Sequence, residues 1–444
     1  MFLLLLLLLV VVVVFMCMDR RQRRLFRCSE VVVPYRYSDP SWNKEKSSII
    51  FSRGAIARQT LEFERLRKIG PPTSNQPSNH SQESTHTLPK MPWQTLFTSK
   101  FGCRLPIMAP PMIGVSGARL VAAAQSAGAL GFLPAGHLEN VGDLQKEIAL
   151  YRSLTNNQET LSLGFIGHSA TSSSSLEQWQ RYEKILEEEK PAFVQFFAPA
   201  VSYHPTTGQS NIELAQKYDA LVMAQVGNVE SAVQAWEAGA DALIVQGAEA
   251  GGHGLRPPLG RSLLPLLADV KALVRNSLPV LAAGGIVTGQ TAAAVLCAGA
   301  DGVVIGTRLW ASQQALGHET YKQAMVEAPS CDAVVRTTVV DQIQNHYTPY
   351  PWPQPFDSLG MLRNEVTEKW QDKSKELGQA LGSDTCPSLD YRTANQEGNA
   401  QRGAVLSGQG VGQIQSIESV EDIIAKIDQE MKQTIENITN QLLE

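Results

Sequence analysis

The residues best suited to chemistry lie in the stretch 246–254, QGAEAGGHG, directly after the apolar run 241–245. Glycines allow a backbone to approach a bound group closely. Histidine is the side chain that exchanges protons near neutral pH. The stretch therefore predicts the end of a strand that faces a ligand, with His253 as its reactive group. The alternative for an isolated Gly-Gly-His is an ordinary surface loop, and the rest of the chain has to decide between them.

The elements that would position this loop are short apolar runs separated by helical segments. Eight such runs occupy residues 105–110, 130–134, 161–166, 192–197, 221–226, 242–246, 279–283 and 302–305. Continuous rather than alternating apolar runs are typical of parallel strands covered on both faces. We therefore predict an α/β protein with a (β/α)8 TIM barrel. A doubly wound open sheet is the second choice, because eight strands without a G-x-G-x-x-G turn favour the barrel.

Two helices share one ending. The segments 229–238 and 291–298 both run into Gly-Ala-Asp and then directly into a strand. A helix closed by glycine and followed at once by a strand is the turn of a repeating β/α unit.

Two glycine turns follow the seventh and eighth strands. They are Gly284-Gly285 and Gly306-Thr307. In β/α barrels, these strand ends bind phosphate through backbone N–H groups. The chain has no Walker A motif and no metal-ligand pattern, so such a phosphate would belong to a cofactor or to a phosphorylated substrate. Two tight turns without a ligand are the alternative.

Four histidines follow strands. His137 and His204 lie in polar loops beyond their strands, and His168 lies nearer a strand end. His253 follows the sixth strand in the most glycine-rich loop, and it is the best candidate for proton transfer.

Charge and cysteine content limit the partners. The 444 residues carry a net charge of −5 and no basic stripe, which argues against nucleic acid as a partner. Six scattered cysteines without a CxxC pair indicate reduced thiols in a reducing compartment.

The segment 2–18 consists almost wholly of Leu and Val. At helical rise it would cover about 25 Å, against a hydrocarbon core of about 30 Å. Arginines follow the segment instead of preceding it, which is the opposite of a signal peptide. If it inserts, the positive-inside rule keeps the rest of the chain in the cytosol. Membrane contact, a segment that never inserts, and a wrongly assigned start stay open, as does organelle targeting through the arginines.

The domain boundaries expected from these patterns are an apolar segment 1–18, a disordered extension 19–90, a barrel 91–312, a helical cap 313–401 and a C-terminal return helix within 402–444. The extension has linker composition. The cap is expected to hold helices at 319–327 and 359–373 and an aromatic-proline loop at 346–353, and the return helix to span 420–443.

Several motifs together resemble the nitronate monooxygenases, a family also known as 2-nitropropane dioxygenases. The motifs are PIMAPPM at 106–112, GAEAGGH at 247–253, AAGGI at 282–286, IGT at 305–307 and LSGQGVG at 406–412. The resemblance implies a barrel that binds FMN, with the flavin ring contacted by Pro110, Pro111, Met112, Gln225 and Gly252. It implies a phosphate held by Gly284, Gly285, Gly306 and Thr307, and His253 as the catalytic histidine. Many bacterial relatives carry Asn where this chain has Phe165, which puts one flavin contact in doubt.

The activity implied is FMN-dependent oxidation of alkyl nitronates, or of nitroalkanes, by O2 to carbonyl compounds and nitrite. His253 would either take the α-proton as a neutral imidazole or stabilise the anion as an imidazolium, and the sequence does not choose between the two. One alternative is an FMN-dependent enoyl-thioester reductase that consumes a reduced nicotinamide. Another is a non-catalytic flavoprotein tethered to a membrane. The sequence predicts no oligomeric state and no metal.

Overall fold

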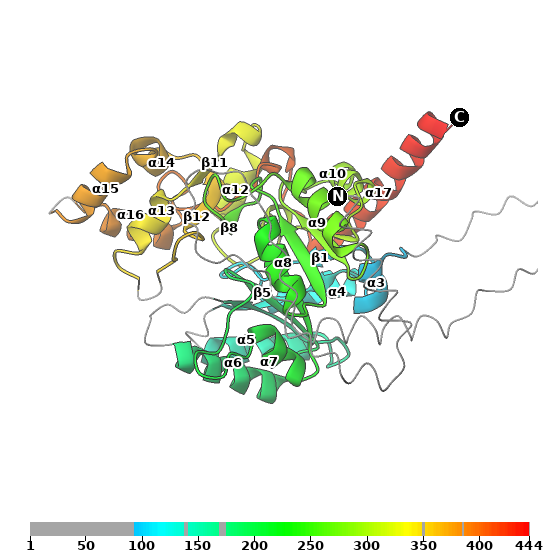
Figure 1. The fold of residues 1–444 in the computed structure, drawn as a ribbon. Coiled ribbons are helices and arrows are strands. Elements are labelled where there is room, and N and C mark those ends of the chain that lie inside the picture. Colours follow the sequence, from blue (N-terminus) through cyan, green and yellow to red (C-terminus); the bar gives the residue numbers. More distant parts are fainter. Residues whose placement is uncertain (1–92, 137–140, 168–174, 349–350, 384–385, 444) are drawn as a thin grey trace, which may run out of the picture. The chain divides into compact units, whose positions relative to one another are not determined.

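The computed structural model describes residues 93–136, 141–167, 175–348, 351–383 and 386–443 (Figure 1). These residues belong to one compact unit, 87–444. The expectations for the segments 1–18 and 19–90 lie outside the described residues, as do His137 and His168. No helix in the described part of the chain is long and apolar enough to cross a bilayer.

The central sheet is a ring of parallel strands. Its order is β2-β1-β10-β9-β7-β6-β5-β4-β3. The strands are β1 (Ile107–Ala109), β2 (Leu130–Gly131), β3 (Leu133–Gly136), β4 (Ser162–Ile166), β5 (Phe193–Phe197), β6 (Leu221–Val226), β7 (Ala242–Gln246), β9 (Val280–Ala283) and β10 (Gly302–Val304). Only Phe132 separates β2, which pairs with β1, from β3, which pairs with β4. The two ends of the sheet are thus halves of one strand. The predicted eight-stranded barrel is confirmed, and the open sheet is wrong.

Alternate strand residues face opposite layers of the barrel. In β7, Ile244 belongs to the cluster inside the ring, whereas Leu243 and Val245 pack with the surrounding helices. The inner cluster also contains Phe97 and Phe101 from α3 (Leu96–Phe101), and Phe101 packs against a ring at the start of β5. The N-terminal end of the barrel is therefore filled by side chains.

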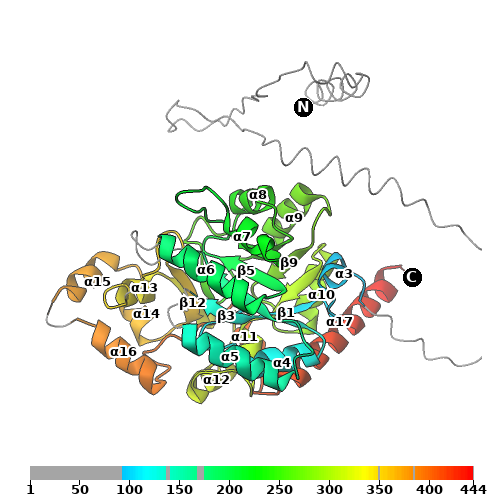
Figure 2. The same cartoon turned by 90° about the horizontal axis from the view of Figure 1, so that it is seen from below.

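Helices surround the ring (Figures 1 and 2). They are α4 (Ala118–Ser126), α5 (Val141–Leu154), α6 (Ser175–Glu189), α7 (Asn211–Lys217), α8 (Val229–Glu237), α9 (Leu263–Val274), α10 (Gly289–Cys297) and the short α11 (Thr307–Trp310). The helices predicted at 229–238 and 291–298 are confirmed as α8 and α10.

The repeated Gly-Ala-Asp has a physical explanation. Gly239 and Gly299 adopt positive φ values of 86° and 101°, which end α8 and α10 at little steric cost. The aspartate that follows then fixes the next strand. Its carboxylate accepts a hydrogen bond from an amide at the start of the neighbouring strand, from Val222 at 3.0 Å for Asp241 and from Val280 at 2.9 Å for Asp301.

The segment 313–401 is not purely helical. It contains α12 (Glu319–Val326), the 3-10 turn η1 (Cys331–Ala333), β11 (Val334–Thr337), α13 (Val339–Gln344), β12 (Ser358–Leu362), α14 (Glu365–Trp370), α15 (Ser374–Leu381) and α16 (Ser388–Glu397). Figure 1 shows its yellow and orange elements gathered on one side of the barrel.

The helix predicted at 359–373 is wrong in its first part. Ser358–Leu362 is a fully buried strand, paired antiparallel with β11 and with β8 (Gly252–Gly254). A five-residue apolar run is compatible with either a helix or a strand, and pairing with a distant glycine loop decides it here. The helix begins only at Glu365, where the Asn364 side chain caps it.

After the cap, the chain passes through η2 (Val411–Gln413) into α17 (Val420–Leu443), the predicted return helix. Figures 1 and 2 both show α17, in red, alongside α10. The contact is close: a Cβ on Gly289 would approach Glu430 Cβ to 2.2 Å, and the Gly289 amide donates to the Glu430 carboxylate at 2.8 Å. This helix therefore completes the outer layer of the barrel.

A chain shortened to begin at Met91 is expected to remain soluble and to keep its melting temperature. It retains Trp93, whose Nε1 donates to Asp428 at 2.7 Å, and all of α3. A chain beginning at Leu105 is expected to aggregate, because it loses the buried Phe97 and Phe101, each worth about 3–5 kcal/mol in a core. Thermal unfolding of both chains checks this. Aggregation of the chain that begins at Met91 would show that residues before Met91 belong to the fold.

Candidate functional site

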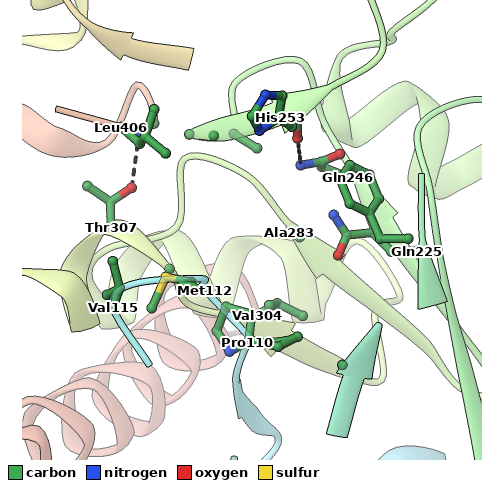
Figure 3. A pocket seen from close by; sticks show the side chains of 18 of the residues that line it. Pro110, Met112, Val115, Gln225, Gln246, His253, Ala283, Val304, Thr307 and Leu406 are labelled. Atoms are coloured by element: carbon green, nitrogen blue, oxygen red, sulfur yellow. Dashed lines mark hydrogen bonds between the residues drawn. The ribbon is translucent and has the colours of Figure 1, made fainter. Parts of the chain in front are cut away.

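A cavity of about 400 Å³ opens at the C-terminal ends of the strands (Figure 3). All ten residues that the sequence analysis assigned to a site line this cavity. They are Pro110, Pro111, Met112, Gln225, Gly252, His253, Gly284, Gly285, Gly306 and Thr307. Strand order brings them together, because the ends of parallel strands meet on one face of a barrel.

The turn after β1 forms one wall. The Pro110 carbonyl accepts a hydrogen bond from the Ser116 hydroxyl at 2.8 Å, and the Met112 carbonyl accepts one from the Val115 amide at 3.0 Å. Pro111 fits because residue 164 is glycine, since a Cβ there would lie 2.1 Å from Pro111 Cγ. This wall is thus fixed by hydrogen bonds to its carbonyls and by the close packing of Pro111 on Gly164.

Phe165, whose presence put one flavin contact in doubt, contributes to packing. Its ring stacks on Phe196 with centroids 5.7 Å apart and meets Tyr182 edge-on at 5.1 Å. The side chain belongs to the core between strands and helices.

Three glycine segments meet at one end of the cavity. Gly284 and Gly285 have φ values of 122° and 68°, which side chains rarely adopt. The Thr307 hydroxyl accepts a hydrogen bond from the Gly408 amide at 3.0 Å, and a Cβ on Gly410 would lie 2.6 Å from the Gly285 carbonyl. Residues 408–410 were quoted in the resemblance but were not expected among the site residues. This end of the cavity is lined by backbone.

Glutamines that the sequence analysis did not select lie beside Gln225. Gln195 Nε2 donates to Gln225 Oε1 at 2.7 Å, and Gln246 Nε2 donates to the His253 carbonyl at 2.9 Å. Gln195 is buried, yet its Oε1 has no hydrogen-bond partner in the described part of the chain. An amide in the middle of an apolar strand was the sequence signal that could have revealed Gln195, because such a group needs a partner.

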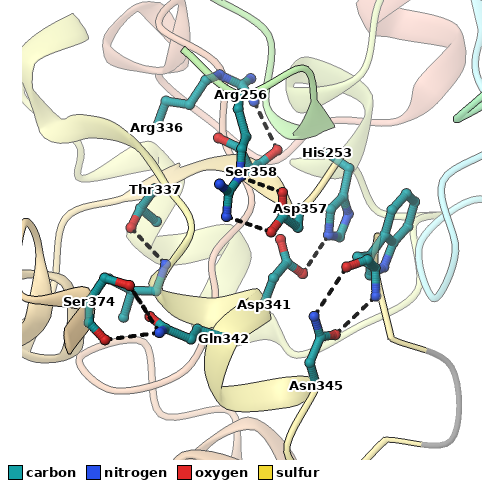
Figure 4. Close-up of polar contacts among 12 residues, drawn as sticks. His253, Arg256, Arg336, Thr337, Asp341, Gln342, Asn345, Asp357, Ser358 and Ser374 are labelled. Atoms are coloured by element: carbon teal, nitrogen blue, oxygen red, sulfur yellow. Dashed lines mark hydrogen bonds and ion pairs between the residues drawn. The ribbon is translucent and has the colours of Figure 1, made fainter. Parts of the chain in front are cut away.

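His253 is held by two residues of the cap (Figure 4). It lies on β8 opposite Leu359 of β12. Its Nε2 is 2.8 Å from Asp341 Oδ1, and its ring stacks on Trp352 with centroids 3.6 Å apart and planes 10° apart. Asn345 fixes Trp352 by accepting from its amide at 2.9 Å and donating to its carbonyl at 3.1 Å.

The loop that carries His253 is fixed from β11. The Arg336 guanidinium donates to the carbonyls of Ala248 at 3.1 Å, Ala250 at 2.5 Å and Ser358 at 3.1 Å. Burial lowers the pKa of Arg336 to about 10, so it remains charged at neutral pH. The two charge-assisted bonds to Ala248 and Ala250 join the loop to the cap, and the third, to Ser358, lies within the cap.

His253 is the one titratable side chain among the described residues that line the cavity. His204 lies elsewhere, where its Nδ1 accepts from the amides of Thr206 and Thr207 at 3.1 Å and its ring meets Trp179. That arrangement is structural, as its position in a polar loop suggested.

No cluster of His, Cys, Asp or Glu in the described residues is arranged to hold a metal ion. The four described cysteines are free thiols. Burial raises the pKa of Cys103 to about 12, which keeps that thiol protonated and unreactive at neutral pH.

A β/α barrel with a glycine-lined cavity at its strand ends and one titratable group in the cavity wall has the architecture of a barrel enzyme. The chain belongs to the nitronate monooxygenase family, whose profile matches residues 94–430. The protein is therefore a nitronate monooxygenase-like oxidoreductase, which argues against a non-catalytic flavoprotein. Members of this family are typically flavin-dependent.

Relatives within this family differ in their reactions. The nitronate monooxygenase npaC of Metarhizium robertsii is 31% identical over 280 residues, which cover 60% of this chain and 74% of that protein. A Mycobacterium tuberculosis protein named as a dehydrogenase of a 5-hydroxy-7a-methyl-1-oxo-octahydro-1H-indene-4-carboxyl-CoA is 28% identical over 359 residues, covering 75% of this chain and 95% of that one. The structure of FabK from Thermotoga maritima superposes with a TM-score of 0.61 at 26% identity, covering 79% of this chain and 100% of FabK.

Proposed function

We propose that this protein binds FMN and oxidises alkyl nitronates, and nitroalkanes through their nitronates, with O2 to carbonyl compounds and nitrite. The observation on which the proposal depends is the position of His253 in the cavity. It is the one titratable side chain of the described cavity wall, and it faces the same cavity as the glycine turns.

The residues that line the cavity support the binding of FMN. Gly284, Gly285, Gly306 and Thr307 would hold the phosphate through backbone N–H groups. A Cβ on Gly306 would lie 3.6 Å from Met112 Sδ and 4.0 Å from Pro110 Cγ, so the glycine leaves open a space between cavity-lining residues.

Beside these residues, the flavin ring would lie against the turn 110–112, Gln225 and Gly252. The buried Gln195 Oε1, unpartnered in the described part of the chain, offers an acceptor for a ring N–H. When bound, FMN supplies the two-electron chemistry of the reaction.

This chain's own residues would handle the proton and the charge. With a neutral nitroalkane, the imidazole of His253 would accept the α-proton, leaving the electron pair on the substrate as a nitronate. With a preformed nitronate, His253 would act as the imidazolium, donating a hydrogen bond to the nitronate oxygens. Apolar walls from Ile113, Phe197 and Trp352 would exclude water and strengthen both interactions.

A second candidate, an FMN-dependent enoyl-thioester reductase, is favoured by a second chamber. This chamber of about 150 Å³ shares Phe197, Gln225 and Gln246 with the main cavity and continues to Leu255 and Phe356. A small nitronate has no part that would reach it, whereas a thioester arm would. The relative named for a carboxyl-CoA substrate supports the same alternative.

Nitrite release separates the two candidates. Purified protein supplied with an alkyl nitronate and O2, without nicotinamide, is expected to release nitrite in step with oxygen consumption. With an enoyl thioester and NADH or NADPH, nicotinamide oxidation is expected to stay at the level without thioester. Thioester-dependent nicotinamide oxidation without nitrite release would select the reductase.

A further inference from the structure

We propose that Asp341, carried by the cap, is a positioning residue that fixes the proton of neutral His253 on Nε2 and leaves Nδ1 as the atom that accepts the substrate proton. The part that concerns the substrate rests on the proposed function. The assignment of the two ring nitrogens rests on geometry alone.

The contact between Asp341 and His253 is short and largely shielded from water. Asp341 Oδ1 lies 2.8 Å from His253 Nε2, and the exposed fractions of the two side chains are 1% and 14% (Figure 4). Asp341 Oδ2 is also buried and has no hydrogen-bond partner in the described part of the chain. The bond to His253 is therefore the hydrogen bond that compensates for burying this carboxylate.

The tautomer follows from the donor inventory. A neutral imidazole has one N–H donor and one acceptor nitrogen, and an ionised carboxylate can only accept. The hydrogen between Nε2 and Oδ1 therefore belongs to Nε2. Nδ1 keeps its lone pair and has no protein hydrogen bond among the described residues, and the stack on Trp352 fixes the plane of the ring.

Other polar groups near Asp341 do not compete for this role. The Arg256 guanidinium is bound by Asp357 at 2.6 and 2.7 Å, and Arg336 is bound to three carbonyls. Burial raises the pKa of Tyr391 on α16, with a further contribution from Asp341, so the phenol stays neutral. Asp341 is thus the carboxylate that contacts the imidazole.

The proton step is then balanced at named atoms. The α C–H bond of the substrate breaks, the proton forms an N–H bond at Nδ1, and the electron pair stays on the substrate as the nitronate. The resulting imidazolium lies against the Asp341 carboxylate, which stabilises it.

Two replacements at Asp341 separate charge from hydrogen bonding. Asp341→Asn keeps an oxygen that can accept from Nε2 but removes the charge, and Asp341→Leu removes both at similar volume. Asp357→Asn is the matched control, because it removes a nearby buried carboxylate that binds Arg256 and not His253.

The first readout is ¹⁵N NMR of His253 in substrate-free protein, at a pH where the ring is neutral. We expect the Nε2–H tautomer in the wild-type protein, Asp341→Asn and Asp357→Asn, and a mixture of tautomers in Asp341→Leu. Nδ1–H in the wild-type protein, or an unchanged tautomer in Asp341→Leu, would overturn the assignment. Because no substrate is used, this result stands or falls separately from the nitronate activity.

The second readout is turnover. Relative to Asp357→Asn, we expect kcat/KM for a neutral nitroalkane to fall by about 10-fold or more in Asp341→Asn and by about 10²-fold or more in Asp341→Leu. On a preformed nitronate, the loss should be smaller than on the nitroalkane, because no proton has to leave carbon. Equal losses on both substrates would refute a role in proton transfer. If Asp341→Leu does not fold, Asp341→Asn still tests the proposal. The deciding quantity is then the ratio of kcat/KM on the nitroalkane to kcat/KM on the nitronate.

Discussion

Replacing His253 by Asn is expected to lower kcat/KM for a neutral nitroalkane by about 10²-fold or more, which is the usual contribution of a general base. Asn can donate a hydrogen bond but cannot accept the proton. FMN is expected to remain bound, because its phosphate end is formed by backbone from other strands. Steady-state rates and the flavin spectrum of the purified variant measure the two effects.

The loss should be smaller on a preformed nitronate, where no proton has to leave carbon. His204→Asn is the matched control, since that ring lies outside the cavity and binds two loop amides. Near-wild-type rates of His253→Asn on both substrates would remove His253 from the mechanism and direct attention to His168. Loss of flavin with little loss of rate per bound flavin would give His253 a structural role.

Gly306→Val is expected to weaken FMN binding by about 10²-fold or more, equivalent to about 2.8 kcal/mol. Gly306 has φ −95° and ψ −78°, a helical region that side chains adopt. The nearest atoms to a Cβ there are Met112 Sδ at 3.6 Å and Pro110 Cγ at 4.0 Å, which is ordinary contact. The fold should therefore survive while the branched side chain enters the cavity beside Met112 and Pro110, where FMN is proposed to lie.

The measurements for this variant are flavin content after purification and titration of the apoprotein with FMN. Gly378→Val, on a helix with open space around the glycine, is the control and should bind FMN like the wild-type protein. Wild-type affinity in Gly306→Val would place the phosphate elsewhere. A wild-type protein that is colourless and cannot be reconstituted would contradict the cofactor assignment itself.

The barrel could be predicted because its signals are local. Each strand is a short apolar run, and each Gly-Ala-Asp sets both the end of a helix and the start of the next strand. The ten cavity-lining residues assigned from the sequence could also be predicted, since they follow strand ends and these ends converge on one face.

The environment of His253 could not be predicted, because its partners are distant in sequence. Asp341 and Trp352 lie in an insertion whose position depends on the pairing of β8 with β12. The run Ser358–Leu362 has no alternation that distinguishes a strand from a helix. An aspartate within an apolar helical segment, such as Asp341 beside Val339 and Val340, was the one local hint, since a buried carboxylate needs a partner.

We propose that a bound flavin oxidises a nitronate at the cavity, without nicotinamide. The most direct test is to mix the purified, FMN-loaded protein with an alkyl nitronate in the absence of O2 and follow the flavin absorbance. We expect the oxidised flavin spectrum to bleach within the turnover time and to return, with release of nitrite, when O2 is admitted. A flavin that stays oxidised with nitronates but is bleached by NADH or NADPH would contradict the claim.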